Sequence, residues 1–330
     1  MSAASRVIPI IDQGTAYGRP QPTSMRELAE VGPGTPMGEL LRRYWHPIGL
    51  VSDATDRPRK VRVLGEDLIL FRDKSGRVGL LYPHCAHRGT SLYYGKVDEH
   101  GIRCCYHGWQ FDVQGHCLHQ PCEPGGGRAR EAKRQPWYPV QEQYGLIWAY
   151  MGPPERKPAL PRYECLEQLG EGEFLEADDS SIGGGGPQII PCNWLQHYEN
   201  LVDPFHVVIL HSSFSGTQFV PEMAVMPEVQ WDTTALSVRA ISMRQLPDGR
   251  RLRRISEAAL PTLRVIPSPR LGREGQGGPV ESLGWVLPID DHSFRIYVVG
   301  RVREEGELRR MRTRMNGKLW EEMSEEEHQL

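Results

Sequence analysis

The sequence predicts an α+β protein with two domains: a small antiparallel β domain, followed by a domain that combines an antiparallel sheet with helices. The chain has 330 residues, which is long for one hydrophobic core and comfortable for two. Short strand-like runs separated by turn residues follow residue 46 and continue to about residue 155, as in small antiparallel domains. Beyond residue 190 one helical segment precedes several strands, without the alternation that βαβ units require.

We divide the chain into an extension (1–40), a β domain (41–155) and a second domain (156–330). Residues 38–46 place apolar side chains at helical spacing, so a helix is expected before the first strand. The proline-rich segment MGPPERKPALP, residues 151–161, is expected to link the two domains.

The second domain is expected to open with a glycine loop at 183–186 and a helix that starts at Trp194, with Pro204 near its end or at a kink. Strand-like runs follow, at 235–246, 261–268, 281–289 and 294–302. Apolar residues spaced by three or four predict an amphipathic helix near the carboxy end: Leu308, Met311, Met315 and Leu319. Residues 324–327, SEEE, fit a capping box that opens one more helix, which the chain end cuts short.

The composition excludes several classes of partner. The net charge is −3, and no basic run is interleaved with aromatic residues as in nucleic-acid grooves. No apolar run reaches the roughly 20 residues of a membrane span, and the amino terminus lacks the apolar core of a signal peptide. Seven cysteines are an odd number, which argues against a complete disulfide framework and favours a cytoplasmic location. The His and Cys residues within 116–122 match no metal signature.

Cys85, His87, Cys104 and His107 form the first candidate metal cluster, with the spacing C-x-H, sixteen residues, C-x-x-H. Each short pair can grip one metal atom because a tight turn brings its two side chains to one side. Cys105 repeats the C-x-H spacing with His107, so spacing alone does not decide which of the adjacent cysteines is used. A set of two Cys and two His also fits structural zinc.

His206 and His211 form the second candidate, H-x4-H. On one continuous α-helix five residues amount to about 500° of rotation, which leaves the two rings about 140° apart. They converge only if the helix bends or ends between them. Two histidines and one carboxylate on one face of an octahedron let Fe(II) bind dioxygen beside a substrate.

These motifs resemble those of a known family. CAHRG followed by CCYHGW is similar to the Rieske [2Fe–2S] signature, in which Cys104 would be the ligand and Cys105 stands where proline is usual. ENLVDPFHVVILH resembles the catalytic domain of Rieske non-haem iron ring-hydroxylating oxygenases. The resemblance covers nearly the whole chain, and the segments VGPGTPMGELLRRYWHP and MGPP are most similar to the phthalate-dioxygenase-like branch. It implies a helix-grip (START-like) second domain.

The resemblance also implies the roles of the site residues. Cys85 and Cys104 would hold one iron of the cluster, and His87 and His107 the other. His206 and His211 would ligate a mononuclear Fe(II). Asp203 would connect that centre to His107 of the neighbouring subunit, or else cap a helix end ahead of Pro204, and Asn200 and Glu199 match a polar pair near the iron.

The third iron ligand is the departure from the family pattern. In the family it is an Asp or Glu on a carboxy-terminal helix, and Glu321 or Glu322 stand near the lower edge of that distance. Their ordinary role is a solvated helix face, and we expect the ligand to be missing from this chain. Weak binding of the mononuclear iron and poor turnover would follow.

The implied function is the oxygenase component of a multicomponent Rieske oxygenase. It would use O2 and electrons from NAD(P)H, delivered by a flavin and ferredoxin-type reductase, to hydroxylate or O-demethylate an aromatic carboxylate or aryl ether. Electron transfer between subunits implies a homotrimer. The rival interpretation is a non-catalytic Rieske electron carrier whose second domain only binds a partner, and a structural zinc protein is a third.

Overall fold

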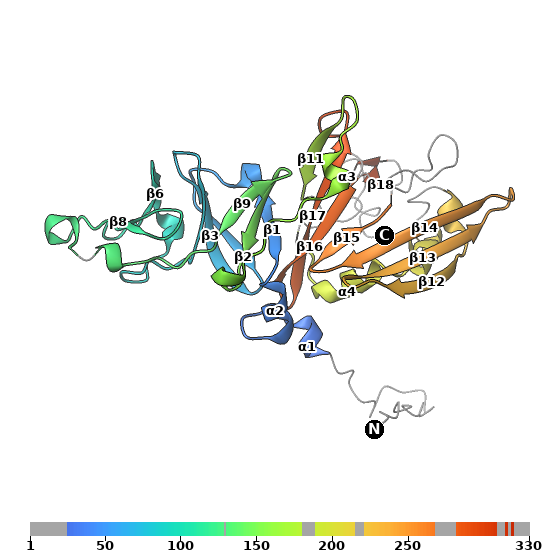
Figure 1. Ribbon diagram of the computed structural model, residues 1–330, viewed down its shortest axis with the longest axis horizontal. Helices are drawn as coiled ribbons and strands as arrows, with labels where there is room; N and C mark the ends of the chain where they lie inside the picture. The colour runs from blue at the N-terminus through green and yellow to red at the C-terminus, as the bar shows by residue number, and fades with distance from the viewer. Residues whose placement is uncertain are drawn as a thin grey trace, which may run out of the picture.

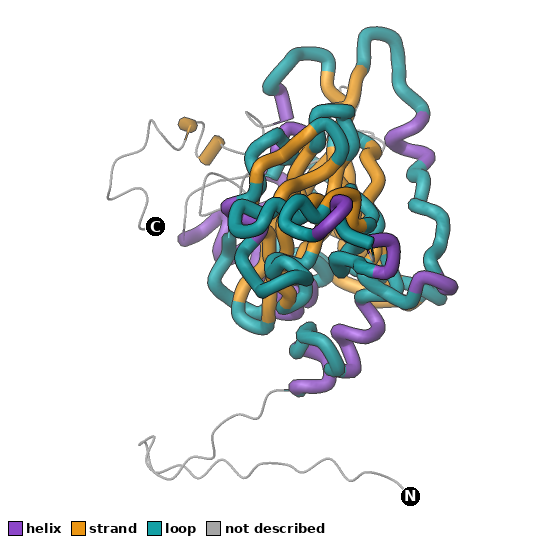
Figure 2. Tube along the Cα trace, turned by 90° about the vertical axis from the view of Figure 1, so that its left-hand side faces the viewer, coloured by secondary structure: helices purple, strands orange, loops and turns teal. Residues whose placement is uncertain are grey.

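The computed structural model describes residues 25–128, 130–179, 189–214, 221–267 and 282–308, together with the pairs 314–315 and 318–319. The molecule is elongated (Figure 1): the β domain lies at one end, and the hairpin of strands β13 and β14 reaches the other. Seen from the β-domain end, the strands of successive sheets overlap along the line of sight, and long loops run around them (Figure 2).

Three small antiparallel sheets form the β domain. Most of their strands pair with a strand that is next in sequence, and the first sheet also pairs the first strand of the domain with its last. The first sheet has the order β1 (Trp45–Leu50), β10 (Leu146–Tyr150), β9 (Val140–Gln143). The second has the order β2 (Arg59–Val63), β3 (Glu66–Arg72), β4 (Val78–Leu81). The third has the order β5 (Lys96–Asp98), β6 (Gly101–Arg103), β7 (Gln110–Phe111), β8 (Cys117–His119).

One seven-stranded antiparallel sheet forms the second domain. Its order is β11 (Phe174–Asp178), β17 (Ser293–Val302), β16 (Ser282–Asp290), β15 (Leu263–Val265), β14 (Arg251–Ala259), β13 (Ser237–Gln245), β12 (Glu228–Thr233). This sheet, together with the β domain, confirms the predicted α+β class.

The described helices are short, and none has the length and apolarity needed to cross a bilayer. Two precede the first strand, α1 (Arg26–Ala29) and α2 (Pro36–Leu41), and α3 (Glu164–Glu167) precedes β11. Two more precede β12: α4 (Trp194–Asn200) and α5 (Phe205–Ile209), which continues as a π-helical turn over Leu210–Phe214.

The helix expected over residues 38–46 is only half right. Thr35 caps α2, its hydroxyl accepting from the backbone of Gly38, and the helix ends at Leu41. Trp45 already pairs with Tyr150 as the first residue of β1. The gain from pairing with the buried strand β10 overrides the helical periodicity, which is a weak local preference.

The helix expected over residues 308–319 is wrong in its carboxy-terminal part. Leu308 is helical, residues 309–313 lie outside the described residues, and β18 (Arg314–Met315) pairs antiparallel with β19 (Lys318–Leu319). The sequence between them is Asn-Gly, which is the strongest short-range signal for a β-hairpin and outweighs the helical spacing of the apolar residues. The further helix expected at 324–327 lies outside the described residues.

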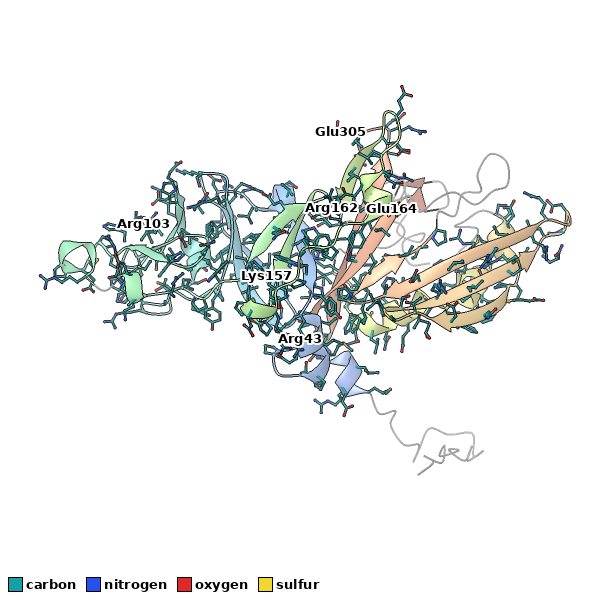
Figure 3. All side chains as sticks on the ribbon, in the orientation of Figure 1. Arg43, Arg103, Lys157, Arg162, Glu164 and Glu305 are labelled. Carbon is teal, nitrogen blue, oxygen red and sulfur yellow. The ribbon has the colours of Figure 1, made fainter. Side chains whose placement is uncertain are left out.

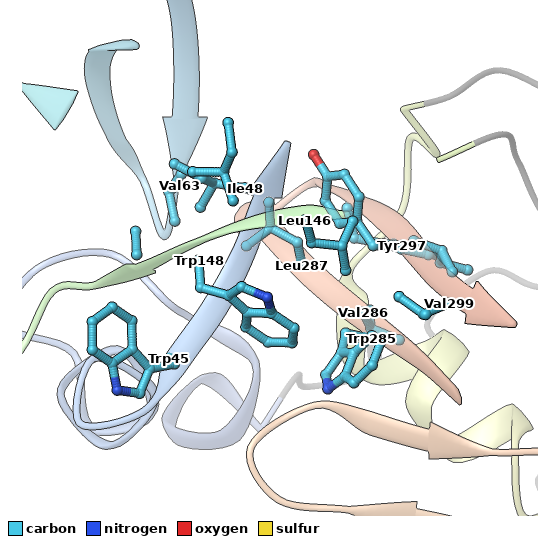
Figure 4. Packing of buried hydrophobic residues seen from close by; sticks show 14 of the residues in the cluster. Trp45, Ile48, Val63, Leu146, Trp148, Trp285, Val286, Leu287, Tyr297 and Val299 are labelled. Atoms are coloured by element: carbon cyan, nitrogen blue, oxygen red, sulfur yellow. The ribbon is translucent and has the colours of Figure 1, made fainter. Parts of the chain in front are cut away.

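A shared hydrophobic core joins the two domains (Figure 4). Trp148 of β10 meets Trp285 of β16 edge to face, with ring centroids 5.0 Å apart, and both are almost fully buried. The turn after β2 bonds directly to β16, since Leu64 N donates to Pro288 O (3.0 Å) and Gly65 N to Ile289 O (2.8 Å). The β domain therefore packs against the part of the seven-stranded sheet around β16.

Candidate metal centres

Two loops of the β domain carry the first cluster, and their backbones form the same turn. In each loop the cysteine carbonyl accepts from a glycine four residues on, Cys85 O from Gly89 N (2.8 Å) and Cys104 O from Gly108 N (3.1 Å). Both glycines have positive φ, 75° and 72°, which favours glycine. Each cysteine N–H in turn bonds to the carbonyl five residues on. The repeated C…G spacing therefore produces two matching loops.

The structure separates the two adjacent cysteines. Cys104 is buried, 4% exposed, beside the equally buried Cys85, whereas Cys105 is exposed. Successive side chains of an extended segment point to opposite sides, so only one of the pair can face the other loop. Burial raises the pKa of the Cys85 thiol to about 11, and the neighbouring Cys104 adds to this shift. Binding a metal there must displace protons from the sulfur.

The two histidines come from the same loops and meet at the surface end of the cluster. The rings of His87 and His107 lie edge to face, with centroids 4.8 Å apart. The His87 ring stacks on Trp109, at 4.5 Å and 2° between planes. His107 Nδ1 is buried and has no hydrogen-bond partner among the described residues. Two buried sulfurs, two adjacent imidazoles and an unpaired ring nitrogen fit a [2Fe–2S] cluster with two sulfur and two nitrogen ligands.

Gln135 holds the loop that carries Cys85 and His87 through hydrogen bonds to its backbone. The sequence alone did not identify this residue. Its side chain is fully buried, Oε1 accepts from Ala86 N (2.8 Å), and Nε2 donates to Tyr82 O (2.8 Å) and His84 O (2.9 Å). The only sequence signal was a polar residue before a strand-like run, which many exposed positions share.

The His and Cys residues of 116–122 face different partners. His116 Nδ1 lies 2.9 Å from Asp112, and His119 Nδ1 accepts from Arg103, which Figure 3 labels near β6. Cys117 is buried and Cys122 is exposed. The Nδ1 atom of each of these two histidines thus has a protein partner.

His206 and His211 come together because the helix changes type between them. The α-helix α5 ends at Ile209 and a π-helical turn begins at Leu210. A π turn bonds residue i to residue i+5, which brings residues five apart onto one side. The two rings lie edge to face with centroids 5.3 Å apart. The α-helix thus ends between the two histidines, as the H-x4-H spacing requires. Two imidazoles that converge in this way suit a ferrous ion.

Asp203 lies in the turn between α4 and α5. One carboxylate oxygen caps α5 by accepting from Phe205 N (2.9 Å), and the other lies 3.3 Å from His206 Nδ1 without hydrogen-bond geometry. The side chain is 46% exposed, so it can still contact another subunit. Both expected roles, helix cap and partner of a histidine, are compatible with this position.

His197 of α4 is a residue of this site that the sequence did not suggest. Its ring stacks on Phe294 at 5.2 Å, and its Nε2 is buried without a hydrogen-bond partner in the described part of the chain. Burial lowers the pKa of His197 to about 3, helped by the positive charges of Arg264 and His206. The imidazole is therefore neutral near pH 7. Asn200 and Glu199 are exposed at the end of the same helix.

Across the described residues, no three His, Cys, Asp or Glu side chains converge on a single-ion site. Glu321 and Glu322, the candidates for the third ligand of the mononuclear iron, lie outside the described residues. That ligand stays unassigned.

Comparison with known proteins places these loops and helices in a family. A model of the Rieske [2Fe–2S] domain matches residues 44–139. The alpha subunit of phenoxybenzoate dioxygenase from Ectopseudomonas oleovorans is 51% identical to this chain, over 98% of the chain and 80% of that subunit. The chain belongs to the Rieske aromatic oxygenase alpha subunits. It is thus an oxidoreductase, the oxygenase component of a multicomponent system, and it carries a Rieske [2Fe–2S] domain.

Other relatives of this oxygenase subunit agree. The oxygenase subunit of 5,5'-dehydrodivanillate O-demethylase from Sphingobium sp. is 47% identical over 57% of this chain, which corresponds to 43% of that protein. The crystal structure of dicamba monooxygenase bound to dicamba shares the fold, with a TM-score of 0.63 over 82% of this chain and 81% of the other, at 21% identity. The chain thus spans four fifths of one relative and less than half of another.

Proposed function

We propose that this oxygenase subunit hydroxylates or O-demethylates an aromatic carboxylate or aryl ether, with O2 as co-substrate. Electrons would come from NAD(P)H through a separate flavin and ferredoxin-type reductase. The convergence of His206 and His211 across the π turn carries the proposal, because a simple electron carrier has no need of a second histidine pair. The relatives named as phenoxybenzoate dioxygenase and dehydrodivanillate O-demethylase support the substrate class.

When bound, the cluster would supply one-electron redox chemistry and the ferrous ion would supply activation of dioxygen. Cys85 and Cys104 would hold the cluster from inside, and His87 and His107 from the surface side. The Trp109 ring stacks on His87 and restrains the plane of its imidazole. His206 and His211 would hold the mononuclear iron, and the carboxylate of Asp203 would orient the His206 ring.

We propose a homotrimer because the electron path from the cluster to the mononuclear iron would cross from one subunit to its neighbour. The half-exposed carboxylate of Asp203 is free to accept a hydrogen bond from His107 of an adjacent copy. Beside His107 the Tyr106 ring is 63% exposed, with ring centroids 3.9 Å apart, so the edge of the cluster offers an apolar contact surface. The cytoplasmic location expected from the cysteine count stays a prediction.

Two measurements test the proposal. Iron and sulfide analysis of the purified protein should give about three irons per chain for an oxygenase. About two irons would favour the non-catalytic carrier or an oxygenase that holds its mononuclear iron weakly, and zinc alone would exclude both. In Asp203→Asn the cluster should remain reducible by the reductase while substrate oxidation collapses. Near-normal turnover in that variant would remove Asp203 from the electron path.

A further inference from the structure

A cavity of about 470 Å³ opens beside the cluster loops, in the segment that follows β8. This segment lies at the end of the molecule that the β domain occupies (Figure 1). The cavity wall is formed by Trp109, which follows the second cluster loop, and by the chain between Gln120 and Lys133. The four expected cluster ligands do not line it, so the cavity is separate from the cluster site. Its volume suits a small ligand.

Two side chains of the wall carry buried N–H groups that need an acceptor. Trp109 is 7% exposed and Gln120 is 3% exposed. Neither Trp109 Nε1 nor Gln120 Nε2 has a hydrogen-bond partner within the described part of the domain, although the Cys117 thiol lies close to the Gln120 amide. Gly127, with a φ of 95°, closes over this amide, because a Cβ at that position would overlap Gln120 Oε1. Buried donors without an acceptor leave the wall electropositive.

The charged side chains around the cavity are mainly cationic. Arg128 and Lys133 line it and are exposed, and the described chain offers neither of them an ion pair. Glu123 is the one carboxylate among the lining residues. Over residues 120–134 four Arg and Lys side chains stand against two Glu side chains. Unpaired cations beside unpaired N–H donors favour an anionic oxygen acceptor.

The cavity wall is in contact with both cluster loops. The Trp109 ring stacks on His87, with ring centroids 4.5 Å apart. On the other side, Cys122 Sγ lies 3.6 Å from His107 O, which ties the segment after β8 to the second loop. A negative charge in the cavity would therefore lie against the ring that stacks on a cluster ligand.

We propose that this cavity binds a small anion with a carboxylate or phosphate group, and that Arg128 and Lys133 hold it. Two sources share this chemistry: a free anion in solution, and an acidic side chain of the reductase. Reduction adds an electron to the cluster, so a nearby anion binds the oxidised state more tightly and lowers the reduction potential. A tenfold difference in affinity between the two states corresponds to about 59 mV for a one-electron couple.

The first arm of the test measures a free anion, with inorganic phosphate as the probe, on the full-length protein loaded with its cluster. By calorimetry the wild type should bind phosphate, and Arg128→Gln and Lys133→Gln should each raise its Kd by about tenfold or more. Lys96→Gln is the matched control, because Lys96 is exposed on β5, does not line the cavity and removes the same charge. In a redox titration followed by visible absorbance, saturating phosphate should lower the midpoint of the wild type and of Lys96→Gln, but not that of Lys133→Gln.

The second arm measures reduction of the cluster by a surrogate flavin and ferredoxin-type reductase in phosphate-free buffer. If the anion is an acidic side chain of the reductase, phosphate should not bind. Arg128→Gln and Lys133→Gln should then need several times more reductase for half-maximal reduction, whereas Lys96→Gln should not. Cavity variants that match Lys96→Gln in both arms would overturn the inference, and phosphate binding that leaves the midpoint unchanged would refute the effect on the cluster. These results do not depend on any aromatic substrate, so they stand or fall separately from the proposed oxygenation.

Discussion

Replacing Gln135 by leucine should loosen the first cluster loop while leaving the ligands themselves intact. The side chain makes three buried hydrogen bonds, of 2.8, 2.8 and 2.9 Å, to the backbone of Ala86, Tyr82 and His84. At about 1 kcal/mol net for each bond, their loss should cost about 3 kcal/mol. Since about 1.4 kcal/mol corresponds to a factor of ten, opening of this loop should become on the order of a hundred times more frequent.

Release of iron from the cluster into a strong chelator, followed by visible absorbance, measures this opening. Gln135→Leu should lose its cluster much faster than the wild type, and its thermal midpoint should fall. Gln141→Leu is the control, because Gln141 is exposed on β9 and makes no side-chain hydrogen bond that the structure records. If Gln135→Leu and Gln141→Leu released iron at the same rate, the claim that this amide holds the loop would be refuted.

Two further predictions follow from burial. Cys104→Ser should abolish the visible spectrum of the cluster, whereas Cys105→Ser should keep it, because only Cys104 is buried beside Cys85; loss of the spectrum in both variants would contradict the assignment. Burial lowers the pKa of His46 from about 6.5 to about 4. As the pH falls, the unfolded chain therefore binds a proton at His46 before the folded chain does. The free energy of unfolding should fall by about 3 kcal/mol between about pH 6.5 and about pH 4. The thermal midpoint of His46→Gln should decline less over the same range, and a parallel decline would exclude His46 as the cause.

The sequence predicted the cluster loops well because the residues that determine each loop are close together in the sequence. Each loop is a short turn with its cysteine at one end and a glycine of positive φ at the other, so spacing alone sets the backbone path. The α+β class was equally accessible, since strand-like runs and turn residues are local patterns. Two helices that the structure corrects, one of them half right, show the limit of this approach. Periodicity favoured a helix at 38–46, where pairing with β10 prevailed, and at 308–319, where a hairpin formed instead.

Contacts between distant segments decided the rest. Spacing left Cys104 and Cys105 equivalent, and only the packing of one loop against the other buried the first and exposed the second. His206 and His211 are too far apart on a regular helix, and a π turn at the end of α5 brings them together. Arg244 and Arg254 are ten residues apart in sequence and share one face of the sheet only through the register of β13 and β14. The amino-acid sequence by itself therefore determined which chemical groups this oxygenase subunit carries and how its short turns bend. Only the tertiary structure decided which of those groups come together, because burial and strand pairing depend on the whole fold.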